Sequence, residues 1–537
     1  MSQRSAHVDT WVRDRLPTAR ERPELRFDLP ELQLPERLNC ATILLDRHVL
    51  EGRGDAPCVV EADRTYSYAQ LADRCDRIAH VLVDDLGVVP GNRVLLMGRN
   101  SSTLLACWHA VMKVGAVAVT VAPSLLPREL THVLERANVN AALVGHVFLP
   151  RLQDALLDAE RADARVARLS WGLGDLERLA ETKPGRFAAV DTAADDPCII
   201  AFTSGSTGTP KAAVHTHRDV IATCAVFAGA PVGAKPSDVF VGSPPLAFTF
   251  GLVALGCYPL YLGASVVLME RAGAVELAQA IERHRATLCF TVPTVYRTWL
   301  RSDPPPDLSS LRVAISSAEP LGRGDWLEFR ARTGLEIVNV LGSTEMLHAF
   351  ISSGVAPPRP GSVGRPIRGY QATVLGPDGR ELPDGEIGKL AVKGPTGCFY
   401  LDDPRQQEQV CAGWTITGDY ARRDDDGYFW LEGRVDDVII SSGYNISPAE
   451  VEAVLIEHPG VAECLVVPVR DAVKGAVLKA VVVPTPSLPA VPESGELLRE
   501  YVLRRLAAYK CPRVVEFVDE LPRTATGKVR RRSGTGQ

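Results

Sequence analysis

The stretch Cys198–Lys211, CIIAFTSGSTGTPK, joins a short apolar run to a loop of small hydroxyl residues and glycines that ends at one lysine. The five apolar residues at its start are typical of a buried β-strand. Because Gly205 and Gly208 carry no Cβ, backbone N–H groups of such a loop can approach phosphate oxygens, and the lysine adds positive charge. A proline before the lysine and an alanine after it depart from the G-x4-G-K-[ST] pattern of P-loop proteins. Taken alone, the stretch indicates either another kind of phosphate loop or an ordinary flexible turn.

The sequence around this loop alternates between helical and strand patterns. A capping box at Ser67–Gln70 begins a helix, and Arg93–Met97 and Ala116–Thr120 read as strands. A second α/β series runs from about residue 237 to 345, and short strands with Gly, Pro and Asp turns follow after about residue 360. We therefore expect an α/β protein with a large N-terminal domain, residues 1–435, made of two α/β sheet subdomains plus a small β-rich subdomain. A small α+β C-terminal domain, residues 436–537, is expected to follow.

Composition excludes several classes of protein. The 537 residues have a net charge of −6, and no basic face or domain indicates a nucleic-acid partner. The twelve cysteines form no CxxC pair and no Cys/His group with zinc-ligand spacing, which indicates reduced, buried thiols in a cytoplasmic protein. The first residues lack the apolar core of a signal peptide. The charge-free run Val239–Met269 contains prolines and glycines, so we expect strands and turns in a buried core rather than a membrane span.

Four further motifs accompany the loop at 203–211, in a fixed order. They are Leu341–Glu345 (LGSTE), Thr417–Asp419 (TGD), Gly433–Arg434 and Pro522–Lys528 (PRTATGK). The set resembles the adenylate-forming superfamily of acyl-CoA synthetases, adenylation domains and luciferases, and the resemblance covers nearly the whole chain. It implies that a carboxylate attacks the α-phosphorus of ATP to give an acyl adenylate and pyrophosphate, after which a thiol displaces AMP. The cofactors implied are ATP, Mg²⁺ and coenzyme A.

The resemblance also assigns roles to individual residues. Lys528 would bridge the carboxylate and the α-phosphate, Thr344 would lie at the α-phosphate, and Glu345 would hold Mg²⁺. Asp419 would bind the ribose hydroxyls, and Arg434 would reach ribose or phosphate. The nucleotide-binding set implied is Thr203, Ser204, Gly205, Ser206, Thr207, Gly208, Lys211, Ala318, Glu319, Pro320, Asn339, Val340, Leu341, Gly342, Ser343, Asp419 and Arg434.

In the resembled family the small domain is mobile and rotates between the two steps. Asp436 matches the hinge position of this rotation. After the rotation, the coenzyme A arm would pass Ser442, Gly443 and Tyr444, where a glycine suits a close approach of backbone to a thin chain. An ordinary structural turn is an equally good interpretation of these three residues.

The acid pocket is expected at Pro245–Gly251, PLAFTFG, which contains no carboxylate. Adenylation domains for α-amino acids commonly place an aspartate here to pair the ammonium group, so such a substrate is disfavoured. The expected substrate-binding residues are Phe248, Thr249, Gly251, Gly342 and His348, although aromatic residues in a buried strand are often core. The stretch GSTEMLH resembles benzoate-type CoA ligases, and SPPLAFTFG resembles 2-aminobenzoate (anthranilate)–CoA ligases.

The sequence thus favours an aryl-CoA ligase for 2-aminobenzoate, with benzoate next. Thr249, Ser343 and His348 are candidates for the hydrogen-bond acceptor that an ortho-amino group requires. Two alternatives stay open: a stand-alone enzyme that loads an aryl acid onto a carrier protein, and an inactive nucleotide-binding sensor or scaffold. A monomer or homodimer without a membrane partner is expected.

Overall fold

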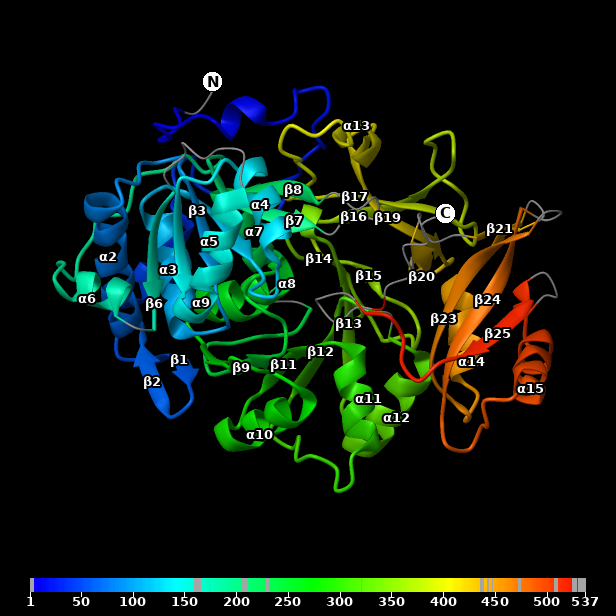
Figure 1. The fold of residues 1–537 in the computed structure, drawn as a ribbon. Helices are drawn as coiled ribbons and strands as arrows, with labels where there is room; N and C mark the ends of the chain where they lie inside the picture. Colours follow the sequence, from blue (N-terminus) through cyan, green and yellow to red (C-terminus); the bar gives the residue numbers. More distant parts are fainter. Residues whose placement is uncertain are drawn as a thin grey trace. The chain divides into compact units, whose positions relative to one another are not determined.

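The computed structural model describes residues 4–158, 166–172, 174–203, 210–227, 231–319, 321–434, 439–441, 444–446, 448–471, 475–506, 510–523 and 529. The chain divides into two compact units (Figure 1). Unit 1 comprises Met1–Ala372 and Ala391–Thr417, and unit 2 comprises Thr373–Leu390 and Gly418–Gln537. The strands β16 (Gln371–Leu375), β17 (Gly388–Lys393) and β19 (Trp414–Arg423) each contribute residues to both units.

Unit 1 contains a six-stranded sheet in the order β6-β5-β3-β4-β7-β8. Its strands are β3 (Arg93–Met97), β4 (Val117–Val121), β5 (Ala141–Gly145), β6 (Ala167–Trp171), β7 (Pro197–Thr203) and β8 (Lys211–Thr216). All neighbours are parallel except β7 and β8. Helix α3 (Ser102–Lys113) packs on β3 and β4. All of its residues are buried, so the rest of the protein covers both its faces. The expected strand at 198–202 and the βα alternation are confirmed.

The second sheet of unit 1 has nine strands in the order β15-β14-β13-β12-β11-β9-β10-β1-β2. They are β1 (Pro57–Glu61), β2 (Arg64–Ser67), β9 (Val239–Gly242), β10 (Ser265–Leu268), β11 (Leu288–Thr291), β12 (Val313–Ser316), β13 (Ile337–Gly342), β14 (Ala349–Ser352) and β15 (Arg365–Pro366). The central strands are parallel, so the chain leaves β12 and β13 at the same edge of the sheet. Binding residues in α/β proteins gather at such carboxyl ends.

Helices cover both sheets. Helix α2 (Tyr68–His80) begins at the expected capping box, in which Ser67 and Gln70 exchange hydrogen bonds. The other α-helices of unit 1 are α1 (Arg47–Leu50), α4 (Pro127–Arg136), α5 (Leu149–Asp158), α6 (Asp175–Glu181), α7 (His217–Phe227), α10 (Ala274–His284), α11 (Pro293–Arg301), α12 (Arg323–Thr333) and α13 (Gln406–Gln409), besides α8 and α9 described next.

Within Val239–Met269 the expected strands and turns are present as β9, β10 and the turns at 243–248, but residues 249–262 are helical, which corrects the rest of that expectation. These residues form α8 (Thr249–Gly251), the π-helical turn η6 (Leu252–Cys257) and α9 (Tyr258–Leu262). Because every residue of η6 is buried, the apolar run shows no polar face from which a helical period can be read. Among the described residues, no helix combines the length and hydrophobicity needed to cross a lipid bilayer.

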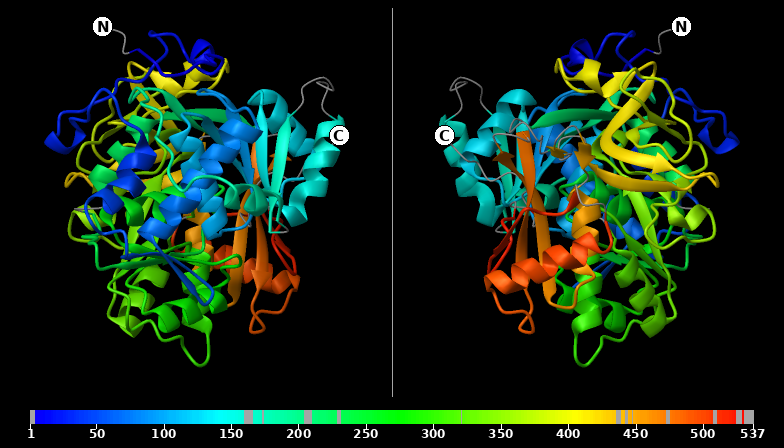
Figure 2. Two further views of the ribbon diagram at one scale, coloured as in Figure 1. Left: turned by 90° about the vertical axis from the view of Figure 1, so that its left-hand side faces the viewer. Right: turned by 90° about the vertical axis from the view of Figure 1, so that its right-hand side faces the viewer.

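Unit 2 contains the antiparallel pair β23 (Val461–Asp471) and β24 (Gly475–Pro484), with β25 (Val514–Phe517) parallel to β24. Helices α14 (Pro448–Ile456) and α15 (Pro492–Leu503) pack on this sheet, as the orange and red segments of Figure 2 show. Their shared core includes Val451, Leu455, Val466, Val482 and Leu498. A short hairpin of β21 (Ile439–Ser441) and β22 (Tyr444–Ile446) precedes α14.

Candidate active site

The β7–β8 hairpin fixes both ends of the glycine- and hydroxyl-rich loop. Thr203 and Lys211 are paired directly across the two strands, and both side chains are partly exposed. The loop residues Ser204, Gly205, Ser206, Thr207 and Gly208 lie outside the described residues. The lysine at the start of β8 therefore faces the end of the strand from which the loop departs.

Tyr400 connects this hairpin to Glu345. Its segment lies along β8 through two backbone hydrogen bonds: Val214 N–H to the Phe399 carbonyl at 2.8 Å and Leu401 N–H to the Ala212 carbonyl at 2.9 Å. The Tyr400 hydroxyl donates a 2.6 Å hydrogen bond to Oε1 of Glu345. Burial and the neighbouring carboxylate raise the pKa of the Tyr400 hydroxyl, so it remains a donor at neutral pH.

The same tyrosine lies beside Lys211. The lysine Nζ is 5.0 Å from the centroid of the Tyr400 ring and donates a 3.3 Å hydrogen bond to Oε1 of Gln409. Gln409 is buried, and its Nε2 donates to the Ile416 carbonyl. The ammonium group is thus positioned by a neutral amide and an aromatic face, without a carboxylate partner among the described residues. Its positive charge remains available to an anion.

His215 stabilises the turn that carries Glu345. The imidazole Nε2 donates a 2.8 Å hydrogen bond to the Thr344 carbonyl in the short helix η7 (Thr344–Met346). Complete burial lowers the pKa of His215 to about 4, so the ring is neutral at physiological pH. The structure thereby brings together four expected residues, Thr203, Lys211, Thr344 and Glu345.

The expected adenine walls differ in exposure. Ala318, in a left-handed backbone conformation with φ of 71°, is exposed, and Glu319 accepts a 2.8 Å hydrogen bond from Thr294 Oγ1. Pro320 lies outside the described residues. Asn339 and Val340 are buried, and the Asn339 amide donates to the Ser362 carbonyl at 3.4 Å. Leu341, Gly342 and Ser343 follow at the partly exposed end of β13.

The expected acid-pocket residues lead into a cluster of aromatic rings around His348. The imidazole centroid is 5.7 Å from Phe250, 5.4 Å from Phe227 and 5.0 Å from Tyr258. Tyr258 is hydrogen-bonded to Nδ1 of His348 at 2.8 Å. Burial lowers the pKa of His348 to about 3, although the Phe250 backbone counteracts part of this effect. The ring cluster is therefore electrically neutral at pH 7.

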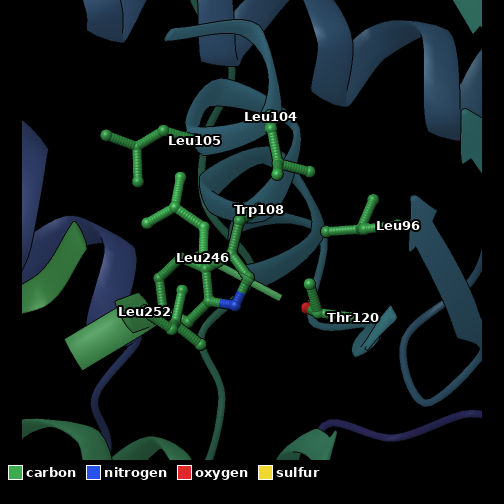
Figure 3. A pocket seen from close by; sticks show the side chains of 7 residues that line it. All are labelled: Leu96, Leu104, Leu105, Trp108, Thr120, Leu246 and Leu252. Atoms are coloured by element: carbon green, nitrogen blue, oxygen red, sulfur yellow. The ribbon is translucent and has the colours of Figure 1, made fainter. Parts of the chain in front are cut away.

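Close packing fixes the conformation of Pro245–Gly251, the segment that precedes these rings. A Cβ on Gly251 would lie 2.1 Å from the Pro245 carbonyl oxygen, so only glycine fits. Thr249 is buried beside it, and Phe248 is partly exposed at the start of α8. Leu246 and Leu252, on either side of this segment, line a small pocket together with Leu104, Leu105 and Trp108 of α3 (Figure 3). Leu96 and Thr120, from the six-stranded sheet, line the same pocket.

Residues 45–399 match the family described as AMP-binding enzyme, and residues 450–528 match the AMP-binding enzyme C-terminal domain. The chain belongs to the AMP-binding enzyme family. The resemblance to the adenylate-forming enzymes is thus confirmed.

Members of this family that act on aryl acids are among the relatives. The benzoate–CoA ligase of Thauera aromatica is 33% identical over 508 residues, which cover 94% of this chain and 96% of the relative. The crystal structure of the anthranilate CoA ligase AuaEII in complex with anthranoyl-AMP has a TM-score of 0.87 at 30% identity, and covers 93% and 97% of the two chains. A benzoate CoA ligase from Burkholderia xenovorans LB400 has a TM-score of 0.82 at 30% identity, with 92% and 99% covered.

The remaining residues expected of an AMP-binding enzyme belong to unit 2 or lie outside the described residues. Asp419 is buried in β19, and the backbone register pairs it with Arg434 in β20 (Phe429–Arg434). Tyr444 begins β22. Asp436, Ser442, Gly443 and Lys528 lie outside the described residues.

Sequence reasoning missed three residues that contact residues expected to bind the phosphates and Mg²⁺. Tyr400, Gln409 and His215 contact Glu345, Lys211 and Thr344 respectively. None of them belongs to the motifs from which the site was predicted. A buried tyrosine, glutamine or histidine carries no local signal of function, so only the tertiary structure reveals them.

Proposed function

We propose that this AMP-binding enzyme is an ATP-dependent aryl-CoA ligase, with 2-aminobenzoate as the preferred acid and benzoate as the next candidate. The acid carboxylate attacks the α-phosphorus of ATP, giving the aryl adenylate and pyrophosphate. The thiolate of coenzyme A then attacks the adenylate carbonyl and releases AMP. Both steps need charge screening and alignment rather than a protein nucleophile.

One observation carries the proposal. The five residues Thr344–His348 connect two groups of side chains. Glu345 contacts Tyr400 in the group expected to bind the phosphates, and His348 contacts Tyr258 in the group of aromatic rings. An acid bound at the rings and a nucleotide bound at Glu345 would therefore meet along a single turn. This arrangement supports the attack of an aryl carboxylate on a nucleotide phosphate.

The phosphate side suits a magnesium nucleotide. Glu345 offers a carboxylate oxygen beyond the one that accepts from Tyr400, and hard oxygen ligands are what Mg²⁺ prefers. The ion would supply charge neutralisation at the phosphates. Lys211 would hold the β- and γ-phosphates, since its ammonium group is not neutralised by a described carboxylate.

The acid side suits a neutral ring. His348 is uncharged, and its Nδ1 is already hydrogen-bonded to the Tyr258 hydroxyl. Only Nε2 of the ring is then left to meet the acid. Ser343 Oγ is buried and makes no hydrogen bond among the described residues, which makes it the best candidate acceptor.

The proposal includes two positions of the C-terminal domain, residues 436–537, relative to residues 1–435. Lys528 would act in adenylate formation, Asp436 would be the hinge, and Gly443 would line the thiol path with Ser442 and Tyr444. Lys528→Ala is expected to abolish adenylate formation while it spares thioester formation from supplied adenylate. A bulky residue at position 443 should do the reverse, and equal loss of both steps in both variants would contradict the two-position scheme.

The direct experiment is a panel of benzoate, 2-aminobenzoate and hydroxybenzoates, scored by AMP release with coenzyme A or with a phosphopantetheinylated carrier protein. Fast turnover of 2-aminobenzoate with coenzyme A supports the proposal. Turnover only with the carrier favours the loading enzyme. Absence of acid-dependent pyrophosphate exchange into ATP would identify a nucleotide-binding sensor or scaffold instead.

A further inference from the structure

Two glutamines of the short helix α13 are buried close to Tyr400 and Lys211. Gln406 is 3% exposed and Gln409 is 9% exposed, whereas Gln407 between them is exposed. Amide side chains lie mostly at protein surfaces, and a buried amide is costly unless its hydrogen bonds are made. The partners of the two buried amides therefore show what this helix holds in place.

Gln406 fixes the backbone of the segment that carries Tyr400. Its Oε1 accepts a 2.8 Å hydrogen bond from the Tyr400 N–H, and its Nε2 donates at 2.9 Å to the carbonyls of Cys398 and Glu21. These three contacts are all with main-chain groups, so Gln406 serves the fold of this segment.

Gln409 contacts the side chains of expected site residues instead. Its Nε2 donates to the Ile416 carbonyl in β19, and its Oε1 lies 3.3 Å from Lys211 Nζ and 3.4 Å from the Tyr400 hydroxyl. The single hydrogen of that hydroxyl is used in the shorter bond, of 2.6 Å, to Glu345. The amide oxygen of Gln409 is therefore left to accept from the ammonium group of Lys211.

The acceptor at position 409 is neutral. An amide oxygen takes one hydrogen of the ammonium group and leaves its charge uncompensated, whereas a carboxylate at the same place would form an ion pair with it. Because Lys211 is partly buried, such an ion pair would compete with any anion that binds the same ammonium group. The Tyr400 ring, whose centroid is 5.0 Å from Nζ, adds attraction without neutralisation.

We propose that Gln409 is a positioning residue for ATP binding. It holds the Lys211 ammonium group in place and keeps the charge of that group available to the phosphates. The inference rests on the proposed function, in which Lys211 holds the β- and γ-phosphates. It adds that a neutral hydrogen-bond acceptor, and not merely a side chain of this size, is required at position 409.

The experiment compares two substitutions at this position. Gln409→Glu keeps the shape and adds a negative charge beside Lys211, whereas Gln409→Met keeps the length and removes the acceptor. Calorimetric titration with ATP and Mg²⁺ should give a dissociation constant about thirtyfold higher for Gln409→Glu and about threefold higher for Gln409→Met. Both variants lose the bond to the Ile416 carbonyl, so a residue that served the fold alone would make them equal. Equal dissociation constants would overturn the proposal.

A second background shows whether the effect acts through the lysine. In the Lys211→Met chain, a further Gln409→Met substitution should leave the ATP dissociation constant unchanged, because the ammonium group that Gln409 positions is gone. An undiminished effect of Gln409→Met in that background would contradict the positioning role.

Gln407→Glu is the matched control, since it makes the same change of charge at an exposed position of α13. It should bind ATP as the wild type does. The titration needs no acid, so its outcome is separate from that of the acid panel. If Lys211→Met weakens ATP binding and Gln409→Glu does not, this inference alone is wrong. If Lys211→Met binds ATP as tightly as the wild type, the phosphate role of Lys211 in the proposed function is wrong, and the role of Gln409 is wrong with it.

Discussion

The Tyr400 hydroxyl donates a 2.6 Å hydrogen bond to Oε1 of Glu345, across 55 residues of sequence. This hydrogen bond fixes the orientation of the Glu345 carboxylate. A cation that binds its second oxygen therefore does not have to restrict the side chain further. In the proposed function, the tyrosine acts on the magnesium nucleotide through Glu345 and is a positioning residue.

Tyr400→Phe is expected to raise the Mg²⁺ concentration needed for half-maximal adenylate formation by about tenfold, since a hydrogen bond to a charged group contributes roughly 1.5 kcal/mol. The measurement is pyrophosphate exchange over a magnesium titration. A loss of activity that added magnesium leaves unchanged would show that the hydroxyl serves only the fold. Tyr66→Phe, on the distant strand β2, should leave the titration unaltered.

Gly251→Ala should weaken acid binding and destabilise unit 1 by about 1–3 kcal/mol, because its Cβ would overlap the Pro245 carbonyl and displace the segment before the rings. Acid KM and the urea midpoint report the two effects. Gly324→Ala is the matched control: it lies within α12, where an added Cβ meets nothing within 4 Å. That variant should be as stable as the wild type or gain up to about 1 kcal/mol. Equal behaviour of the two variants would contradict the tight packing.

Ser343→Ala tests the acceptor for an ortho-amino group. The loss of one buried hydrogen bond should lower kcat/KM for 2-aminobenzoate about tenfold relative to benzoate, which has no such group. Ser317→Ala is the control, because its hydroxyl already donates to the Val340 carbonyl at 3.0 Å and should affect both acids alike. An unchanged preference in Ser343→Ala would assign the acceptor elsewhere.

The buried histidines predict a pH dependence of folding. Burial lowers the pKa of His215 to about 4 and that of His348 to about 3, whereas an unfolded histidine titrates near its ordinary value of 6.5. Between these limits the unfolded chain binds protons that the folded chain does not. Stability is therefore complete above about pH 6.5 and falls with the pH, by roughly 2 kcal/mol for each residue at pH 5.

The difference between the free energies of unfolding at pH 7 and pH 5 should be about 2 kcal/mol smaller in His348→Gln than in the wild type. Urea unfolding at the two pH values measures it. His146→Gln, at a partly exposed position in the short helix η5 (His146–Phe148), should retain the wild-type difference. If the two variants show the same difference, His348 is not the buried neutral group described above.

The sequence predicts what is local. The capping box at Ser67 and the strand before Thr203 are confirmed, because each depends on a few adjacent residues. The sequence did not predict the helical segment 249–262, because apolar residues occur on all its sides and leave no helical period. Resemblance supplied Glu345 and Lys211 as candidates, and their roles stay predictions.

Relationships between distant segments were not predictable. Tyr400 reaches Glu345 only because residues 399–401 lie along β8. Likewise, Cys40, Cys198 and His217 are far apart in sequence, and they converge only because the N-terminal segment folds against β7 and α7.

The short turn from Thr344 to His348 has a consequence for altering this enzyme. In the proposed function His348 faces the acid and Glu345 faces the nucleotide. Because the two are three residues apart, a substitution made at position 348 to admit a different ring is expected to displace position 345 as well. Variants selected for a new acid at that position should therefore lose turnover with every acid. Phe250 and Phe227 lie on separate helices, so ring preference is better changed from those two sides.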